Sequence, residues 1–308
     1  MDWPLRENPH LAGVPGWMTA ALATREPVTG PAATLWVKSW GVTALFEADG
    51  EPVVFKDASP ALFPQAASVY RLLNRVVPSA APALLAEEDF PGYSWSVFGY
   101  VHGQTVKDDG SPRAVRAMAE RLAQVQAAVA TDEGLAGVPG YDVASLPERF
   151  AADLADQPGE TRRRLDRALP WLSSQAAELA TAVPRSLDHP DMNVTNGIVS
   201  PGSEVVVLDW EEASAGCPLF SVDRLTDRDS LAGQDAADVV DAYLGALPWA
   251  DLAGLRHAYA LAHQLVPLQR AAEARAFARA LGRQDPHTRL TGVLIDEALR
   301  RCQTARTS

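Results

Sequence analysis

Apolar and polar residues alternate in the first third of the chain in a way that predicts a small antiparallel sheet. The segment TLWVKSWGVTALFEADGEPVVFK is rich in β-branched and aromatic residues, and it is interrupted at Ser39–Gly41 and at Asp49–Gly50. An Asp-Gly pair between two such runs is a strong hairpin signal. We therefore expect three antiparallel strands, at residues 34–38, 42–48 and 52–56.

A helix is predicted after these strands. The segment QAASVYRLLNRVV carries apolar residues at helical spacing, and Pro64 before it suits the first turn of a helix. This helix would cover the sheet with the stripe formed by Val69, Leu72, Leu73 and Val76. The segment SWSVFGYV, residues 94–101, then predicts a further buried strand.

The remainder of the chain has the pattern of helices rich in Ala, Leu and Arg. Ser111 and Pro112 have the character of a helix cap followed by a first-turn proline, and they open the run RAVRAMAERLAQVQAAVA. Pro267 should kink or break the long helical segment that contains it. Further helices are expected at residues 145–156, 159–182, 233–247, 250–282 and 288–302.

One β-rich segment interrupts this helical half. GIVSPGSEVVVLDW has the pattern of strand, Pro-Gly turn and strand, so a short hairpin is expected. The polar segment LDHPDMNVTN comes directly before this hairpin, and DWE ends it. The hairpin should therefore bring His189, Asp191 and Asn196 close to Asp209.

Composition indicates a soluble globular protein in two domains or two lobes, with 308 residues, 47% hydrophobic and 21% charged. No apolar run reaches the length of about 20 residues that spans a bilayer, and the N-terminus has no signal-peptide pattern. We expect a cytoplasmic protein with no membrane partner. Only Cys217 and Cys302 occur, without metal-ligand spacing, which argues against a disulfide framework or a zinc site.

A net charge of −12 disfavours nucleic acid as a partner, because affinity for phosphate backbones comes from clustered Lys and Arg. The same acidity is compatible with a cationic small-molecule partner, and equally with solubility alone.

The polar segment before the hairpin has a spacing that suits phosphoryl transfer. In the catalytic loop of such enzymes an Asp accepts the proton of the attacking hydroxyl, and an Asn five residues later binds magnesium. Asp191 and Asn196 have this spacing, two and seven residues after His189. Magnesium prefers hard oxygen ligands, and Asp209 at the end of EVVVLDW supplies a second one.

The segment from His189 to Asp223 resembles the aminoglycoside phosphotransferase and choline kinase family. The family signature reads approximately H-G-D-x-H-x-x-N, then a hairpin, then D-W-E-x-A-x-x-G-x-P and a later Asp. The matching positions here are His189, Pro190, Asp191, Asn193, Asn196, Asp209, Trp210, Glu211, Ala213, Gly216, Pro218 and Asp223.

This resemblance implies a bilobal, protein-kinase-like α+β fold. The family has a small antiparallel-sheet N-lobe with one covering helix, a hinge, and a larger, mostly helical C-lobe. The order of strands and helices expected above agrees with it. The implied division places the N-lobe, with the nucleotide-binding sheet and hinge, at residues 1–101, and the C-lobe, with the catalytic loop and acceptor site, at residues 102–308.

The resemblance also implies roles for single residues in the C-lobe. Asp191 would be the catalytic base, and His189 would support the loop. Asn196 and Asp209 would bind Mg²⁺.

The N-lobe residues would hold the nucleotide, ATP or GTP. Lys56 matches the strand lysine that contacts the α- and β-phosphates, although a lysine at a strand end is commonly a solvated charge. Ser39 and Gly41 lie in a turn that would cover the phosphates, with an ordinary hairpin turn as the alternative. Phe98 and Tyr100 belong to FGYVHG, which aligns with the hinge whose backbone pairs with adenine.

The chain departs from the family pattern at the covering helix. The strand lysine is normally paired with a Glu of that helix, but the chain has no acidic residue between Asp57 and Glu87. Gln65 is a neutral substitute near the expected place. Lys56 would otherwise pair with Asp209 or with the nucleotide alone.

Two further departures lie in the catalytic loop. Pro190 replaces the usual Gly and favours an extended His189. Asn193 replaces a His and is able to support the loop through local backbone hydrogen bonds.

These residues favour an ATP- or GTP-dependent, magnesium-dependent phosphotransferase that acts on a hydroxyl. The resemblance favours a small-molecule acceptor, either an antibiotic such as an aminoglycoside or a metabolite or biosynthetic intermediate, possibly a cationic one. Ser or Thr of a peptide is a further option. The alternative hypothesis is a degenerate kinase fold that binds a ligand, peptide or partner protein without phosphoryl transfer.

Overall fold

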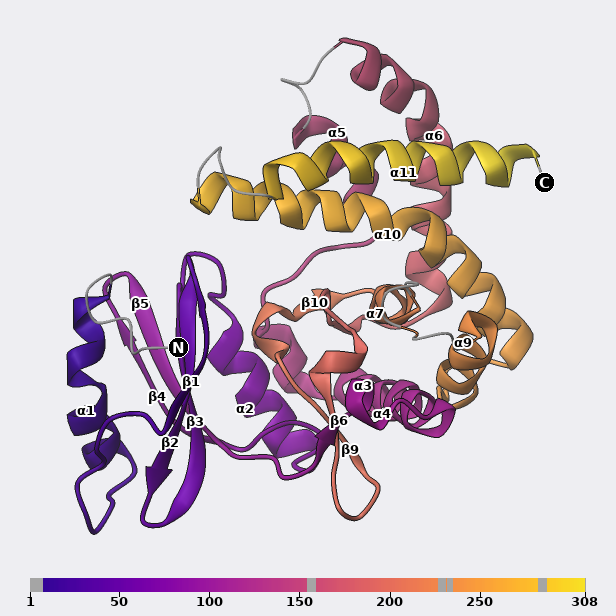
Figure 1. The fold of residues 1–308 in the computed structure, drawn as a ribbon. Helices are drawn as coiled ribbons and strands as arrows, with labels where there is room; N and C mark the ends of the chain where they lie inside the picture. The colour runs from indigo at the N-terminus through magenta and orange to yellow at the C-terminus, as the bar shows by residue number, and fades with distance from the viewer. Residues whose placement is uncertain (1–7, 154–158, 227–230, 232–234, 282–286, 308) are drawn as a thin grey trace.

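The chain folds into two lobes of different composition, a sheet-based N-lobe and a helical C-lobe (Figure 1). The computed structural model describes residues 8–153, 159–226, 231, 235–281 and 287–307. A kinase-like fold with an antiparallel N-lobe sheet was the expectation from the sequence, and the structure confirms it.

The N-lobe is built on one five-stranded antiparallel sheet with the strand order β1-β2-β3-β5-β4. The three strands expected from the first hairpins are present with their ends shifted by one or two residues. Strand β4 was not predicted, because LLAEEDF places three acidic residues in a row on an edge strand that is largely exposed to solvent. The bounds are β1 Ala33–Lys38, β2 Gly41–Ala48, β3 Glu51–Ala58, β4 Leu84–Phe90 and β5 Tyr93–Gly99.

The two faces of this sheet are covered differently. Along β3, Val53 and Phe55 are buried in a cluster with the helix α1, Val14–Ala21, which follows the short 3₁₀ helix η1, Pro9–Gly13. Alternate residues of a strand point to opposite faces, so Lys56 faces the other side, toward helix α2 (Ala66–Val76) and the C-lobe (Figure 1). The sequence analysis expected one covering helix. The sheet has a second one, α1.

Helix α2 joins the cores of the two lobes. Its buried residues Tyr70, Leu72 and Leu73 belong to the same apolar cluster as the C-lobe, together with Phe98 of β5. The face of the sheet that carries Lys56 is therefore packed toward the C-lobe through α2. This packing fixes the position of the N-lobe relative to the C-lobe on the two sides of the cleft.

The C-lobe is mainly helical, and most of its helices were expected. Ser111 caps α4 as predicted, since its hydroxyl accepts a hydrogen bond from the Ala114 amide at 3.1 Å. The helix with Pro267 is continuous, so a break there is wrong, although the helix bends along its length (Figure 1). The bounds are α3 Val106–Asp109, α4 Pro112–Ala130, η2 Glu133–Gly137, α5 Leu146–Asp153, α6 Gly159–Ala182, α7 Leu219–Leu225, α9 Ala236–Gly245, α10 Leu252–Leu281 and α11 His287–Thr307.

Helices α3 and α7 were not predicted, because segments of four and seven residues are too short for a helical period to be recognised. The ends of three expected helices, at residues 154–156, 233–234 and 282, lie outside the described residues.

Short strands arrange the polar segment that the sequence analysis singled out. The expected hairpin is present as β8 (Gly197–Val199) and β9 (Val205–Val207), and β6 (Gln104–Thr105) extends it. A separate pair, β7 (Ser186–Asp188) with β10 (Ser214–Gly216), closes the base of the loop. The 3₁₀ helices η3, Val194–Asn196, and η4, Trp210–Glu212, lie between these strands.

Within the described part of the chain, no helix combines the length and the apolar character that a membrane-spanning segment needs.

Candidate active site

Three neighbouring cavities run through the cleft between the lobes, and they are named here by position. The hinge cavity, of about 430 Å³, is lined by Val54, Phe98, Tyr100, Ile198 and Leu208 among others. The central cavity, of about 210 Å³, is lined by Lys38, Trp40, Asp191, Asn196 and Glu211 among others. The α10 cavity, of about 290 Å³, is lined by Tyr141, Arg149, Ser214, Gln269, Glu273 and Phe277 among others.

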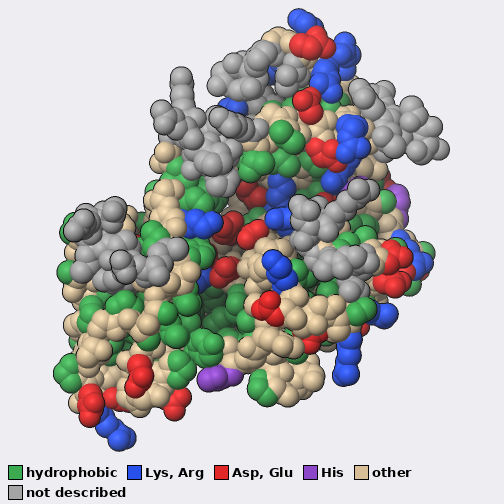
Figure 2. All heavy atoms as spheres, in the orientation of Figure 1, with side chains coloured by type: hydrophobic (Ala, Val, Ile, Leu, Met, Phe, Trp, Pro, Cys, Tyr) green, Lys and Arg blue, Asp and Glu red, His purple; other side chains and the backbone are tan. Residues whose placement is uncertain are grey.

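The central cavity connects the other two. It shares Thr43, Lys56 and Asp209 with the hinge cavity, and it shares Phe63 and Glu212 with the α10 cavity. Figure 2 shows acidic and basic side chains gathered where the surface is hollowed between the lobes. A molecule in each outer cavity would therefore meet the other at the charged residues of the centre.

The loop with Asp191 is fixed by short-range hydrogen bonds. Asn196 donates through Nδ2 to the Asp191 carbonyl at 2.8 Å and to Oδ2 of Asp191 at 3.2 Å. Asn193 donates to the same carbonyl at 2.8 Å and accepts from the Thr195 amide at 2.9 Å, the kind of local bonding expected of it. The Asp191 side chain is 47% exposed and lies 3.6 Å from the guanidinium of Arg224. Asp191 is thus positioned by its neighbours and still open to the central cavity.

His189 lies beneath this loop and is fully buried. Its Nε2 is 2.9 Å from the Leu208 carbonyl, and its ring packs against Trp210 with centroids 4.8 Å apart. Burial lowers its pKa, so the ring is neutral and donates from Nε2 to the carbonyl. His189 connects the loop with Asp191 to the end of strand β9, and it lines none of the three cavities described above.

Asp209 follows β9 in a left-handed backbone conformation, with φ 57° and ψ 41°. Such a conformation is uncommon for residues other than Gly, although Asp tolerates it, and it is often found at functional sites. Oδ1 of Asp209 accepts a hydrogen bond from Nζ of Lys56 at 2.5 Å. Burial opposes ionisation of Asp209, but the charge of Lys56 outweighs it and holds the pKa below its ordinary value.

Lys56 has a second carboxylate partner that the sequence analysis did not assign. Its Nζ also donates to Oε1 of Glu211 at 2.7 Å. Burial alone would lower the pKa of Lys56, but Asp209 and Glu211 together raise it well above its ordinary value. The pairing with Asp209 was one of the open alternatives and is confirmed, whereas Gln65 contacts the Glu211 carbonyl at 3.3 Å instead of Lys56.

Glu211 was visible in the sequence as the third residue of DWE. The signal that was overlooked is the spacing of two residues between Asp209 and Glu211. In the tight turn of η4 this spacing returns the second carboxylate to the same ammonium group.

The turn between β1 and β2 presents different residues to the cleft from those expected. Ser39 and Gly41 are not among the residues that line the central cavity, whereas Lys38 and Trp40 line it. A Cβ at Gly41 would lie 2.1 Å from the Asp57 carbonyl, so strand packing alone accounts for this glycine. Contact of Ser39 and Gly41 with phosphates stays a prediction.

The hinge cavity contains the residues expected to contact the nucleotide base. Phe98 and Tyr100 both line it, together with apolar side chains of the sheet and of the β8–β9 hairpin. Phe98 is buried and packs against Tyr70 with centroids 4.4 Å apart. A slot with apolar walls suits a flat heterocycle.

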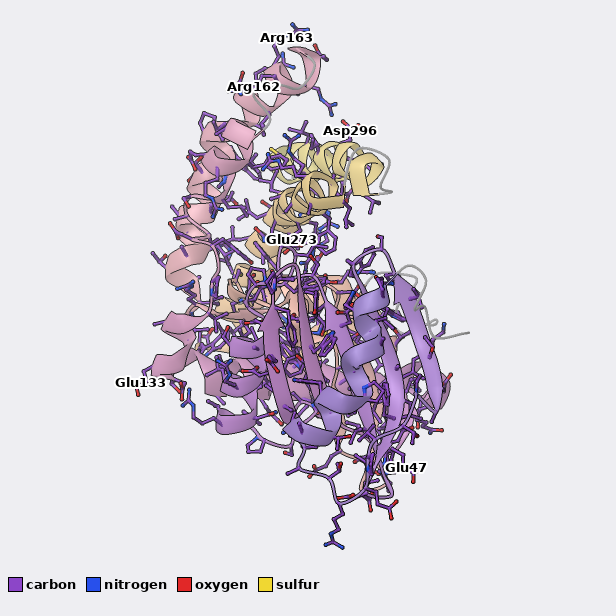
Figure 3. The ribbon with its side chains drawn as sticks, turned by 90° about the vertical axis from the view of Figure 1, so that its left-hand side faces the viewer. Glu47, Glu133, Arg162, Arg163, Glu273 and Asp296 are labelled. Carbon is purple, nitrogen blue, oxygen red and sulfur yellow. The ribbon has the colours of Figure 1, made fainter. Side chains whose placement is uncertain are left out.

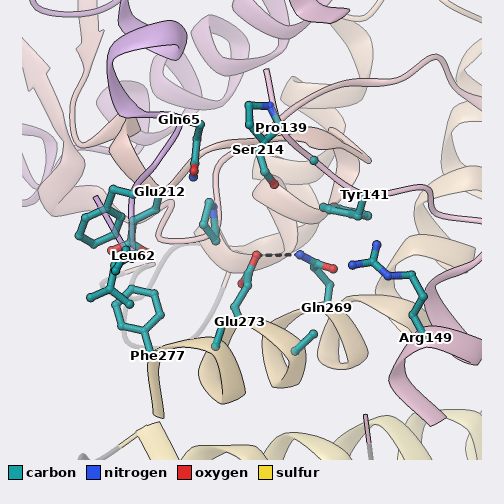
Figure 4. A pocket seen from close by; sticks show the side chains of 16 residues that line it. Leu62, Gln65, Pro139, Tyr141, Arg149, Glu212, Ser214, Gln269, Glu273 and Phe277 are labelled. Carbon is teal, nitrogen blue, oxygen red and sulfur yellow. Dashed lines mark hydrogen bonds between the residues drawn. The ribbon is translucent and has the colours of Figure 1, made fainter. Parts of the chain in front are cut away.

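The α10 cavity combines carboxylates with aromatic walls, and no residue of it was predicted as a site. Figure 4 shows Glu212 and Phe277 on one side, Tyr141 and Arg149 on the other, and Glu273 between them. Glu273 belongs to α10, and Figure 3 places it where this helix lies over the end of the N-lobe sheet.

Glu212 has a raised pKa in this cavity. Burial, aided by the nearby carboxylates of Asp191 and Glu211, raises its pKa to about 8. Among the described residues, no cation is paired with the Glu212 side chain. A positively charged group entering the cavity would reverse this effect and favour the ionised carboxylate.

The central cavity also offers ligands for magnesium. Among the described residues no three His, Cys, Asp or Glu side chains are grouped as a metal site. Magnesium, however, is commonly held by one or two protein oxygens together with substrate phosphates and water. The Asn196 amide and the Asp209 carboxylate both line the central cavity, and their hard oxygens fit this requirement.

A family model described as the phosphotransferase enzyme family matches residues 40–288. The chain belongs to the phosphotransferase enzyme family. The match includes the cavity residues from Trp40 to Phe277. A search of curated protein sequences found no significant match.

Solved structures of this family have the same fold. A choline/ethanolamine kinase family protein from Mesorhizobium loti is 15% identical with a TM-score of 0.60, over 90% of this chain and 88% of that one. A thermostable mutant aminoglycoside phosphotransferase, in ternary complex with ADP and hygromycin B, is 19% identical with a TM-score of 0.61, over 94% and 98%. A choline kinase from Cryptosporidium parvum is 11% identical with a TM-score of 0.60, over 88% of each chain.

Proposed function

We propose that this protein transfers the γ-phosphoryl group of ATP or GTP, in the presence of Mg²⁺, to a hydroxyl group of a small molecule. One observation carries the proposal. Asp191 opens into the central cavity, which shares Lys56 and Asp209 with the hinge cavity on one side and Glu212 with the α10 cavity on the other. This arrangement suits a nucleotide and an acceptor that meet at one carboxylate.

Each polar group has a task in this reaction. Asp191 accepts the proton of the acceptor hydroxyl and orients its oxygen toward the phosphorus. Lys56 donates to the phosphate oxygens and offsets their charge. Asn196 and Asp209 would hold the magnesium ion, which supplies charge neutralisation on the phosphates when it is bound.

The acceptor that fits this site best carries an amine near its reacting hydroxyl. Glu212 lines the α10 cavity without a cation partner among the described residues, whereas Glu273 is paired with Arg270 at 3.0 Å. Phe63 and Phe277 form an aromatic wall of the same cavity, with centroids 5.7 Å apart. An unpaired carboxylate beside aromatic faces suits a cation. One similar structure holds hygromycin B and others are choline kinases, which supports an amine-bearing acceptor.

The alternative, a binding protein without catalysis, was suggested by the absence of a carboxylate on the covering helix. In the structure Lys56 has two other carboxylate partners, Asp209 and Glu211, so this absence no longer favours the alternative.

The first experiment is calorimetric titration of ATP and GTP with Mg²⁺ into the wild-type protein and into Asp209→Ala. We expect binding that requires Mg²⁺ and is lost in Asp209→Ala. Screening of amine-bearing alcohols for nucleoside diphosphate release would follow, with Asp191→Asn as the control that binds nucleotide without turnover. Absence of nucleotide binding at millimolar concentration would refute the proposal.

A further inference from the structure

The ion pair that holds Lys56 connects the two lobes. Lys56 lies on β3 of the N-lobe, and Glu211 lies in η4 at the end of the catalytic hairpin in the C-lobe. Their charged atoms are 2.7 Å apart, with side chains 17% and 16% exposed. A charge-assisted hydrogen bond between such shielded groups fixes geometry more firmly than an exposed pair does.

Helix α2 acts on this pair through Glu211. The hydroxyl of Tyr70 donates to Oε2 of Glu211 at 3.1 Å and accepts from the Trp210 amide at 3.1 Å. Gln65, at the start of the same helix, donates to the Glu211 carbonyl at 3.3 Å. One carboxylate oxygen of Glu211 thus faces Lys56 while the other is held by the covering helix.

We propose that Glu211, braced by Tyr70, positions Lys56 for the nucleotide phosphates in place of the carboxylate that helix α2 lacks. The inference rests on the proposed function, because it assigns a task to the phosphate-binding lysine. Glu211 and Tyr70 are positioning residues in this proposal, since their task is performed through Lys56.

The two carboxylate partners of Lys56 have different tasks in this proposal. Asp209 is also a proposed magnesium ligand, so its carboxylate is shared between the lysine and the metal. In this proposal Glu211 is the partner that keeps Lys56 in place with or without the metal. Without Glu211, Lys56 would compete with magnesium for Asp209.

Measurement of ADP binding in the absence of divalent metal distinguishes the positioning of Lys56 by Glu211 from a general effect of the negative charge of Glu211 on the phosphates. Calorimetry would compare the wild-type protein with Glu211→Gln, Tyr70→Phe and the exposed control Glu204→Gln. If Glu211 positions Lys56, Glu211→Gln should weaken metal-free ADP binding about tenfold, because a charge-assisted bond to the lysine is lost. Tyr70→Phe should weaken it by about two- to fourfold, as a neutral bracing bond is lost. Glu204→Gln should have no effect.

A different change in ADP affinity is expected if Glu211 is merely an acidic neighbour of the phosphates or a magnesium ligand. Removal of its charge would then leave metal-free ADP binding unchanged or tighten it, and the inference would be overturned. A Lys56→Met background supplies a second criterion. In it, Glu211→Gln should no longer weaken ADP binding, because the lysine through which it acts is absent.

The failure of this inference is distinguishable from failure of the proposed function. A wild-type protein that binds ADP while Glu211→Gln binds it equally well overturns only the positioning role. A wild-type protein that binds no nucleotide overturns both. Thermal unfolding would verify that each variant folds, and if Glu211→Gln does not fold, Tyr70→Phe carries the test because it removes a single hydroxyl.

Discussion

The hinge cavity and the α10 cavity lie on either side of Asp191, but they are built in different ways. The hinge cavity is formed by β-strands, the segment that joins the lobes and the β8–β9 hairpin, elements whose backbones pair locally. The α10 cavity is formed by five separate stretches of the chain, at residues 61–65, 139–149, 190, 212–214 and 269–277. Residues of the α10 cavity can therefore change without disturbing the strand pairing that holds the phosphate-binding side.

The two cavities also differ in how their charges are paired. On the phosphate side, Lys56 is paired with Asp209 and Glu211, and Lys38 lines the central cavity. On the acceptor side, Glu273 is paired with Arg270 at 3.0 Å and Arg149 also lines the cavity, whereas no cation of the described residues is paired with Glu212. Glu212 is therefore the carboxylate that an amine of the acceptor would meet, and its alteration should have a kinetic signature distinct from that of the lysines.

The largest effect is expected at the residue between the two cavities. Asp191→Asn keeps the shape of the side chain but removes the base, so kcat should fall about 10³-fold. Because Asp191 belongs to neither outer cavity, the KM values for nucleotide and acceptor should stay within about twofold. Steady-state kinetics with both substrates varied tests this, with the exposed Asp89→Asn as the control. A large change in nucleotide KM would show that Asp191 binds the phosphates.

A smaller and one-sided effect is expected from the acceptor side. Glu212→Gln should raise KM for an amine-bearing acceptor about thirtyfold, through loss of a charge-assisted hydrogen bond. The KM for ATP should change much less, because Glu212 lines the central cavity but not the hinge cavity. The same kinetics with an uncharged alcohol is the matched control, and equal effects on both acceptors would contradict a role in binding the amine.

The pH dependence follows from the raised pKa of Glu212, about 8 in the absence of acceptor. A cationic acceptor needs the ionised form, and the ionised fraction rises roughly eightfold from pH 7 to pH 8.5. Acceptor affinity should rise by this factor over that interval, as measured by calorimetry in the presence of nucleotide. Glu212→Gln should remove the dependence, and an affinity that falls with pH would contradict the assignment.

The same pKa predicts the direction of a stability change. The folded protein retains a proton on Glu212 at pH values where the unfolded chain, with its ordinary pKa of 4.5, has lost it. Stability of the free protein should therefore decline as pH rises from about 5 to 8. Urea unfolding of the wild-type protein and of Glu212→Gln at both pH values tests this, because the variant should lack this contribution.

The smallest effect is expected on the phosphate side. Nζ of Lys38 lies over the rings of Trp36 and Trp40, 5.4 and 5.2 Å from their centroids, and it lines the central cavity. Lys38→Met should raise KM for ATP about threefold with unchanged acceptor KM, as expected for loss of one exposed charge near the phosphates. High salt should reduce the difference between the variant and the wild-type protein.

Much of the fold could be predicted from the sequence because its signals are local. The capped helix α4, the Asp-Gly hairpin and the short β8–β9 hairpin all follow from neighbouring residues. Strand β4 was missed because its run of acidic residues conceals the strand pattern. Helix α1 was missed because it depends on burial against a sheet that the sequence does not display. The brace from α2 to Glu211 was missed for the same reason, since it joins residues 141 positions apart.

The sequence by itself determined the family resemblance and the set of groups at the centre, because the spacing of Asp191, Asn196 and Asp209 is imposed by one loop and one hairpin. Tertiary structure decided the partners of Lys56 and the chemistry of the acceptor side. The phosphate-binding lysine lacks a helix carboxylate in the sequence but finds Glu211 across the cleft. Glu212 gains its raised pKa only when folding shields it partly from water and gathers carboxylates around it, and no local pattern encodes that environment.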